Sequence, residues 1–318
     1  MPRHTSTIMC VFVILFVGLG TPSIYGEKSP SVPVFEVEVI DEYNHDNESW
    51  TQGLLMYNES LYESKGQYGN SSLRKLDLES GNVLNELKFN ETYFAEGIAL
   101  VDDRIILLTW REGTAFVINV DTFEVISNFS YQGEGWGLCY DGVKLVMSDG
   151  SNKLYFREPN TFELIGTINV TLEGVPYSGM LNELECVNGD IYANVWYENE
   201  IVVIDSMNGD IKSIIDVGGL SYQENSTYHE ILNGIAFDEN NSNFIITGKN
   251  WPVAYRVNFL ETELNEISDP IIDNLDEPSI IIPLLVTLFM LIVWAFDLII
   301  RHKVKDDAVK PSVPGEII

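Results

Sequence analysis

The sequence is poor in cysteine and histidine, the residues that most often bind zinc or assist a nucleophile. Its 318 residues include three cysteines and four histidines. Cys10 lies in an N-terminal apolar run, which leaves Cys139 and Cys186, too few for a disulfide framework, and no CxxC or Cys/His cluster indicates zinc. His45 and His229 are the only histidines between the two terminal apolar segments. A three-histidine zinc site is therefore excluded, and a Ser-His-Asp triad has little scope.

Basic residues are also scarce. The chain has 18 Lys and Arg against 48 Asp and Glu, a formal net charge of −30 at pH 7. The negative electrostatic field of so many acidic residues repels phosphates, so nucleic acid is not an expected partner. We interpret the excess as a solvated acidic surface, with a preference for cationic peptides as the alternative.

Long apolar runs occur only at the two ends of the chain. Residues 1–26 have the pattern of a signal peptide, because their apolar run, 8–19, is too short to span a bilayer. Residues 280–300 are long enough to span one, and basic residues follow them directly. We predict a single-pass, type I protein of the cell membrane, with an acidic tether at 260–279, a transmembrane helix at 280–300 and a cytoplasmic tail at 301–318.

The chain carries more Asn-x-Ser/Thr sequons than its Asn, Ser and Thr content predicts by chance. They begin at Asn47, Asn58, Asn70, Asn90, Asn128, Asn169, Asn225 and Asn240. The excess favours an exported and glycosylated domain.

Between its ends the sequence lacks helical periodicity and repeats a unit of short apolar strands separated by Asp, Asn and Gly turns. The first strands of successive units begin 44, 40, 46 and 51 residues apart, close to the spacing of four-stranded propeller blades. They start at Gln52, Glu96, Trp136, Asn182 and Asn233. The five starts predict an all-β fold, a five-bladed β-propeller at 34–259, and argue against an α/β enzyme.

The fifth unit has no fourth strand of its own. Val34 to Ile40 reads VFEVEVI, an alternation of apolar and acidic side chains that is typical of a half-buried edge strand. We predict that this segment pairs with the last unit and so closes the ring.

Two further predictions concern single residues. Cys139 and Cys186 each precede an Asp/Asn-Gly turn by two residues, so they should occupy equivalent places in consecutive units. Because neighbouring blades diverge from the axis and a disulfide requires Cα atoms within about 7 Å, we predict two free thiols. We interpret His45, next to Asp46, as a feature of a turn.

In a propeller the innermost strands surround the axis, so the five start residues should lie near one mouth of the central channel. The second strands return to the same mouth and should bring four more side chains there, Trp110, Asp149, Trp196 and Lys249. Carboxyl, ammonium and amide groups would then meet among tryptophans, the general form of a small-ligand site.

At these residues the sequence resembles the plant and bacterial type of glutaminyl-peptide cyclotransferase, a family of five-bladed propellers. The resemblance covers about Val34 to Phe259. It rests on Thr51-Gln52-Gly53-Leu54, Tyr62-Glu63-Ser64, Tyr68-Gly69 with Ser71-Ser72, Tyr93-Phe94-Ala95-Glu96-Gly97, Gly135-Trp136-Gly137, Leu181-Asn182-Glu183-Leu184-Glu185, Asn194-Val195-Trp196, Leu232-Asn233-Gly234-Ile235-Ala236 and Thr247-Gly248-Lys249 with Trp251-Pro252. It implies an active site that contains Gln52, Phe94, Glu96, Trp110, Trp136, Asn182, Trp196 and Lys249. Trp50 stands where the family usually has phenylalanine, and its larger ring would narrow the pocket.

The resemblance implies that the α-amine of an N-terminal glutamine attacks its own side-chain carboxamide, which forms pyroglutamate and releases ammonia. We assign Glu96 as the proton shuttle between the attacking amine and the leaving nitrogen. Lys249, Asn182 and Gln52 should donate hydrogen bonds to the developing oxyanion, with an ion pair to Glu96 as the alternative for Lys249. The substrate side chain should be held folded by Trp50, Phe94, Trp110, Trp136 and Trp196.

No metal or cofactor is needed for this reaction, although the acidic inner loops leave open a structural calcium ion in the channel. The expected partners are peptides or proteins with an N-terminal glutamine, bound by a monomer. The alternative is a non-catalytic surface propeller that binds peptides or glycans. Glu96 and Lys249 together disfavour it, because binding alone does not require an acid and a cation in one aromatic pocket.

Overall fold

The computed structural model describes residues 32–223 and 231–262 of the chain. These residues form β-strands almost throughout, so the prediction of an all-β fold is confirmed. One short helix, α1 (Gly218–Gln223), was not expected. No helix of the described ranges is long and apolar enough to cross a membrane. The predicted signal peptide, transmembrane helix and cytoplasmic tail lie outside the described residues.

Groups of four antiparallel strands, paired in chain order, follow one another along the sequence. The first group is β2 (Thr51–Tyr57), β3 (Ser60–Lys65), β4 (Ser72–Asp77) and β5 (Val83–Lys88). The second is β6 (Ala95–Val101), β7 (Arg104–Thr109), β8 (Thr114–Asn119) and β9 (Val125–Ser130). The third is β10 (Leu138–Tyr140), β11 (Leu145–Met147), β12 (Lys153–Arg157) and β13 (Leu164–Asn169). A small hairpin, β14 (Thr171–Leu172) and β15 (Val175–Pro176), comes next.

The remaining strands form one eight-stranded sheet in the order β16-β17-β18-β19-β1-β22-β21-β20. Its strands are β16 (Leu181–Val187), β17 (Asp190–Val195), β18 (Glu200–Asp205), β19 (Ile211–Asp216), β20 (Leu232–Asp238), β21 (Asn243–Gly248), β22 (Val253–Glu261) and β1 (Val34–Asn44). β1 pairs antiparallel with β22 and parallel with β19. The predicted pairing of the N-terminal strand with the last unit is confirmed, and β22 continues two residues past the predicted end of the domain at 259.

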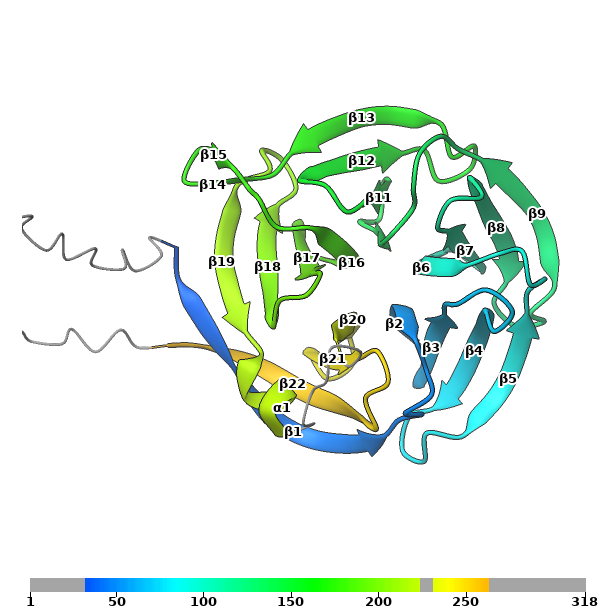
Figure 1. Ribbon diagram of the computed structural model, residues 1–318, viewed down its shortest axis with the longest axis horizontal. Helices are drawn as coiled ribbons and strands as arrows, with labels where there is room; N and C mark the ends of the chain where they lie inside the picture. Colours follow the sequence, from blue (N-terminus) through cyan, green and yellow to red (C-terminus); the bar gives the residue numbers. More distant parts are fainter. Residues whose placement is uncertain (1–31, 224–230, 263–318) are drawn as a thin grey trace, which may run out of the picture. The chain divides into compact units, whose positions relative to one another are not determined.

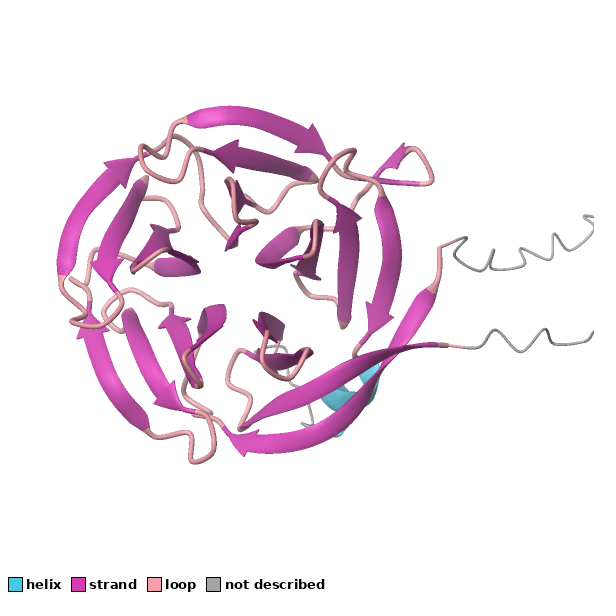
Figure 2. Cartoon of the chain, turned by 180° about the vertical axis from the view of Figure 1, so that it is seen from behind, coloured by secondary structure: helices cyan, strands magenta, loops and turns pink. Residues whose placement is uncertain are grey.

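The four-stranded groups stand around a common centre, with β2, β6, β16 and β20 on the inside and β5, β9 and β13 on the outside (Figure 1). β1, in blue, and β22, in gold, lie side by side where the chain closes on itself. The view from behind shows the same ring of sheets and places the helix beside this closure (Figure 2).

The innermost strands approach one another too closely for most side chains. A Cβ atom on Gly137 would lie 2.0 Å from the carbonyl oxygen of Asn182, so glycine is required there. The fourth unit carries Glu183 at the equivalent position. Its buried carboxylate accepts hydrogen bonds from the amides of Leu54 (3.2 Å) and Ile235 (2.9 Å). One side chain from β16 thus ties β2 and β20 together across the centre.

Cys139 in β10 and Cys186 in β16 form a disulfide, with Cα atoms 5.4 Å apart. The prediction of two free thiols is therefore wrong. It assumed that neighbouring groups of strands diverge, which holds for their outer strands. β10 and β16 are innermost strands and converge at the centre, which brings the two Cα atoms within disulfide range.

Candidate active site

The nine side chains assigned to the site from the sequence all line one cavity of about 270 Å³. The lining residues are Trp50, Gln52, Gln67, Phe94, Glu96, Trp110, Trp136, Asn182, Trp196 and Lys249. Of these, Gln67 was not expected. Asn233 and Asp149, which were expected at the same mouth, do not line it: Asn233 lies behind Gln52, and Asp149 accepts a hydrogen bond from the hydroxyl of Tyr155 (2.8 Å).

Strand register explains why distant residues meet in this cavity. In each antiparallel hairpin the start of the first strand faces the end of the second, as Ala95 faces Thr109 in β6 and β7. Glu96 therefore lies beside Trp110, which follows β7 directly. The equivalent register in β16 and β17 brings Asn182 beside Trp196.

Glu96 is buried, with 4% of its surface exposed, and is held by a chain of amides. Its Oε1 accepts a hydrogen bond from Nε2 of Gln52 (2.8 Å). Nδ2 of Asn233 in turn donates to Oε1 of Gln52 (3.4 Å) and to the carbonyl oxygen of Thr51 (2.9 Å). Asn233 thus fixes the orientation of the Gln52 amide and turns its N–H toward the carboxyl group.

Burial shifts the pKa values of the two ionisable groups of the cavity, Glu96 and Lys249, in opposite directions. It raises the pKa of Glu96 well above its usual range, an effect that the charge of Lys249 and the hydrogen bond from Gln52 oppose. It lowers the pKa of Lys249 to about 8, against the effect of Glu96. Lys249 acts on Glu96 through its charge alone, with no hydrogen bond between them. The alternative of a direct ion pair is therefore not what the structure contains.

Aromatic rings form most of the cavity wall. The ring centres of Phe94 and Trp110 are 5.5 Å apart, and those of Trp136 and Trp196 are 4.9 Å apart, edge to face. Oε2 of Glu134 accepts hydrogen bonds from Nε1 of Trp110 (2.8 Å) and of Trp136 (3.0 Å). The sequence analysis missed Glu134, which stands between two glycines and carries no distinguishing pattern.

Two polar atoms of cavity residues are buried without a hydrogen-bond partner in the described ranges: Oδ1 of Asn182 and Nε1 of Trp196. Buried polar groups are nearly always paired, and orphaned ones need an explanation. Both side chains line the cavity, but neither atom is itself exposed to it.

Gly66 and Gln67 complete the site and were also missed. A Cβ atom on Gly66 would lie 2.5 Å from the ring of Phe94 and 2.8 Å from Cγ of Gln52, so only glycine fits behind these side chains. Gln67 lines the cavity and has a φ of 87°, one of eleven positive φ values at non-glycine residues in the described ranges.

In the part of the chain that the structure describes, no three His, Cys, Asp or Glu residues are grouped to hold a metal ion. The structural calcium ion of the sequence analysis stays a prediction.

Comparison with known proteins shows the family of the chain. The profile of the family described as glutamine cyclotransferase matches residues 13–259. The chain is 37% identical over 229 residues to a glutaminyl-peptide cyclotransferase of Arabidopsis thaliana, which covers 70% of this chain and 71% of that protein. It also matches the crystal structure of Myxococcus xanthus glutaminyl cyclase, with a TM-score of 0.69 and 36% identity, over 73% of this chain and 100% of that one.

These matches define the class of the molecule, the glutaminyl cyclases with an all-β fold. The chain belongs to the glutamine cyclotransferase family.

Proposed function

We propose that this chain is a glutaminyl-peptide cyclotransferase, which converts the N-terminal glutamine of peptides or proteins into pyroglutamate and ammonia. The observation that carries the proposal is that one aromatic cavity contains both a buried carboxyl group of raised pKa, Glu96, and the ammonium group of Lys249.

The reaction forms one C–N bond and breaks another. The neutral α-amine attacks the side-chain carbonyl carbon, and the ionised carboxylate of Glu96 takes a proton from the attacking nitrogen. Glu96 then gives this proton to the carboxamide nitrogen, which leaves as ammonia. A raised pKa suits a group that must accept and donate the same proton near neutral pH.

The other polar residues act on the oxygen that gains charge. The ammonium of Lys249 stabilises the oxyanion. Gln52 uses one amide hydrogen to hold Glu96, which leaves its second for the substrate oxygen. Nδ2 of Asn182 can donate to the same oxygen. The rings keep the glutamine side chain folded, so ring closure has a high effective concentration.

The proposal extends to architecture and location. Three separate four-stranded sheets, together with the two halves of the eight-stranded sheet, support a five-bladed β-propeller. The apolar runs at 8–19 and 280–300 support export and anchoring as a monomeric, type I membrane glycoprotein, and the sequons support glycosylation.

A direct assay tests the function. The purified chain is incubated with a peptide that begins with glutamine, and mass spectrometry follows the loss of one ammonia. The same peptide with an acetylated N-terminus is the control, because its blocked nitrogen cannot attack. Loss of ammonia from the free peptide alone supports the cyclotransferase, whereas binding without any loss favours the alternative of a non-catalytic propeller.

A further inference from the structure

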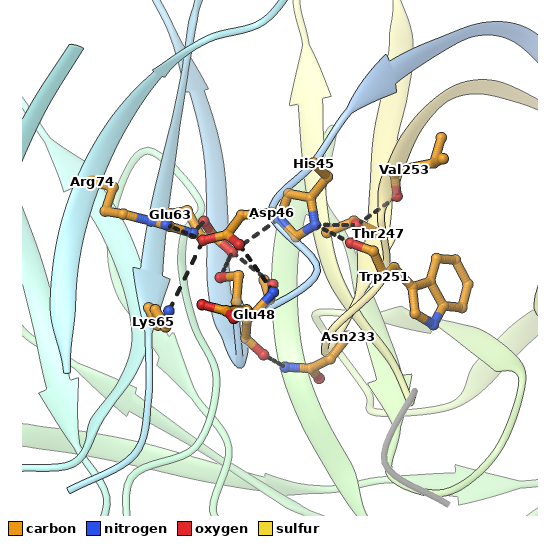
Figure 3. A network of polar contacts seen from close by, with 12 residues as sticks. His45, Asp46, Glu48, Glu63, Lys65, Arg74, Asn233, Thr247, Trp251 and Val253 are labelled. Atoms are coloured by element: carbon orange, nitrogen blue, oxygen red, sulfur yellow. Dashed lines mark hydrogen bonds and ion pairs between the residues drawn. The ribbon is translucent and has the colours of Figure 1, made fainter. Parts of the chain in front are cut away.

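A buried charged network lies where the end of β1 meets β3 and β4 (Figure 3). Glu63 in β3 has no exposed surface. Its Oε1 accepts hydrogen bonds from the hydroxyls of Ser49 (2.5 Å) and Thr51 (2.6 Å), and its Oε2 accepts one from Arg74 (2.6 Å). The other arm of Arg74 donates to Asp46 (2.7 Å). We call this set, with His45, the Glu63 network; none of its members lines the cavity.

His45 joins the network as a cation. Its Nδ1 lies 2.6 Å from the carbonyl oxygen of Trp251, and its Nε2 lies 3.1 Å from Oε1 of Glu63. A carbonyl and a carboxylate oxygen can only accept, so both ring nitrogens must carry a proton. Although burial favours the neutral ring, the charge of Glu63 raises the pKa of His45. The interpretation of His45 as a turn feature is therefore wrong for its side chain, which is buried in an ion pair.

The network is balanced in charge. It contains two cations, His45 and Arg74, and two carboxylates, Glu63 and Asp46. Burial alone would raise the pKa of Glu63, but His45 and Arg74 hold it well below its usual range. Glu63 is thus a permanent anion with three donors at Oε1 and one at Oε2, and it does not titrate near neutral pH.

One segment held by Glu63 carries Trp50 and Gln52 of the cavity. Ser49 and Thr51, on either side of Trp50, turn their hydroxyls to the same oxygen of Glu63. Side chains alternate along extended chain, so fixing these two on one side directs Trp50 to the other, where it lines the cavity.

The second segment held by the network carries Lys249. His45 binds the carbonyl oxygen of Trp251, two residues beyond Lys249. The amide of Asn250, the residue between them, donates to the carbonyl oxygen of Ser49 (2.7 Å). The stretch that leads to Trp50 and the stretch that contains Lys249 are therefore fastened to each other and, through His45, to the same carboxylate.

We propose that Glu63 is a positioning residue of the cyclisation reaction: its network sets the spacing between Trp50 and Lys249 across the cavity. Nζ of Lys249 lies 5.4 Å from the ring centre of Trp50, a cation–π contact between the two segments. A displacement of about 1 Å at reacting groups can lower a rate by about 100-fold, so loss of this fastening should reach the chemistry. The proposal rests on the proposed function of the cavity.

Replacement of Glu63 by glutamine tests it. Glu63→Gln keeps the size of the side chain but loses the charge that pairs His45 and Arg74. We expect kcat/KM per folded molecule to fall by about 10- to 100-fold, mainly in kcat, because Lys249 acts on the transition state. Ser49→Ala removes a single donor to Glu63 and should cause a smaller loss in the same direction. Kinetics with a glutamine-initiated peptide are measured below the lowest unfolding temperature, with the folded fraction from circular dichroism.

Asp238→Asn is the matched control. Asp238 is buried and pairs with Arg256 (2.7 Å), outside the cavity, so its loss breaks a similar ion pair. We expect lower stability and unchanged kcat/KM per folded molecule. If Glu63→Gln fails to fold, Ser49→Ala decides. Wild-type kcat/KM in the folded Glu63 and Ser49 variants, or an equal loss in Asp238→Asn, overturns the positioning role while cyclisation by the wild type stands. A wild type that does not cyclise refutes both proposals.

Discussion

Glu96 and Glu63 are both buried carboxyl groups, yet their surroundings make them opposites. Glu63 meets two hydroxyls, an imidazolium and a guanidinium, and its pKa is held below the usual range. Glu96 accepts one hydrogen bond, from the amide of Gln52, and interacts with Lys249 only electrostatically. Burial raises its pKa. The Glu63 carboxylate thus has four hydrogen-bonding partners in the described part of the protein, whereas the Glu96 carboxyl group has one.

This difference separates structural from catalytic burial. A carboxylate whose partners are all protein groups stabilises the fold and has nothing left to offer a ligand. A carboxyl group short of partners costs stability in the free protein, and a substrate can supply what is missing. The cavity residues Asn182 and Trp196 also have polar atoms that are buried without a partner among the described residues, Oδ1 and Nε1.

The largest expected effect is on turnover when Glu96 is changed. Glu96→Gln keeps the shape of the side chain but cannot carry a proton, so kcat should fall by at least about 100-fold with a much smaller change in KM. Steady-state kinetics with a glutamine-initiated peptide measure both. Retention of more than about a tenth of wild-type turnover would remove Glu96 from the role of shuttle.

The second effect concerns stability, for which we expect Glu63 to matter more than Glu96. Glu63→Gln leaves the buried imidazolium of His45 without a carboxylate and Arg74 with Asp46 alone, and should lower the free energy of unfolding by about 3 kcal/mol or more. Glu96→Gln should leave it unchanged or raise it, because a neutral amide replaces a poorly solvated acid. Urea unfolding of the two variants provides the test, and equal destabilisation would contradict the distinction.

The third effect concerns the cation that acts on Glu96. Lys249→Met should reduce kcat/KM by about 100-fold, the usual effect of losing one oxyanion donor. Lys249 is the main group that lowers the pKa of Glu96, so its loss should move the acid limb of the pH–rate profile to higher pH. Lys65→Met is the control, since Lys65 reaches only Asp46, at 4.0 Å, and should leave that limb in place.

The smallest effect is the pH dependence of stability. The depressed pKa of Glu63 stabilises the fold above about pH 4.5, its unfolded value, and this contribution is lost as the pH falls further. The raised pKa of Glu96 acts in the other direction, because its ionisation costs stability as the pH rises through its folded value. Melting curves should show a flatter acid branch in Glu63→Gln and a smaller decline toward neutral pH in Glu96→Gln. Changes of about 2–4 °C per kcal/mol are expected for a domain of this size.

Seven of the nine predicted cavity residues follow from their fixed places in a repeated hairpin, whereas Trp50 and Phe94 follow from the family resemblance. Glu96 and Asn182 are the second residues of β6 and β16, and Trp110 and Trp196 directly follow β7 and β17. The positions of these four residues in the repeat were enough to predict that they meet at one end of the central channel. The roles of the individual residues do not follow from placement and remain for the kinetics to decide.

The Glu63 network escaped prediction for a physical reason. In Tyr62-Glu63-Ser64 the glutamate looks like the solvent side of an alternating strand, and only its distant partners make burial tolerable. Its partner His45 is bound in turn to Trp251, more than 200 residues away. The disulfide was missed for the same reason. The convergence of β10 and β16 is a property of the closed ring, which local sequence patterns do not reveal.

The pairing of β1 with β22 also has a consequence for biosynthesis. β1 ends at Asn44 and its main partner ends at Glu261, so the strand made first must wait for nearly the whole domain to leave the ribosome. At about 5–20 residues per second this wait is roughly 10 to 45 seconds. An unpaired apolar strand invites pairing with other chains during such a delay. Glu36 and Glu38 are exposed on β1, and like charges of this kind oppose the pairing of a strand with a second copy of itself.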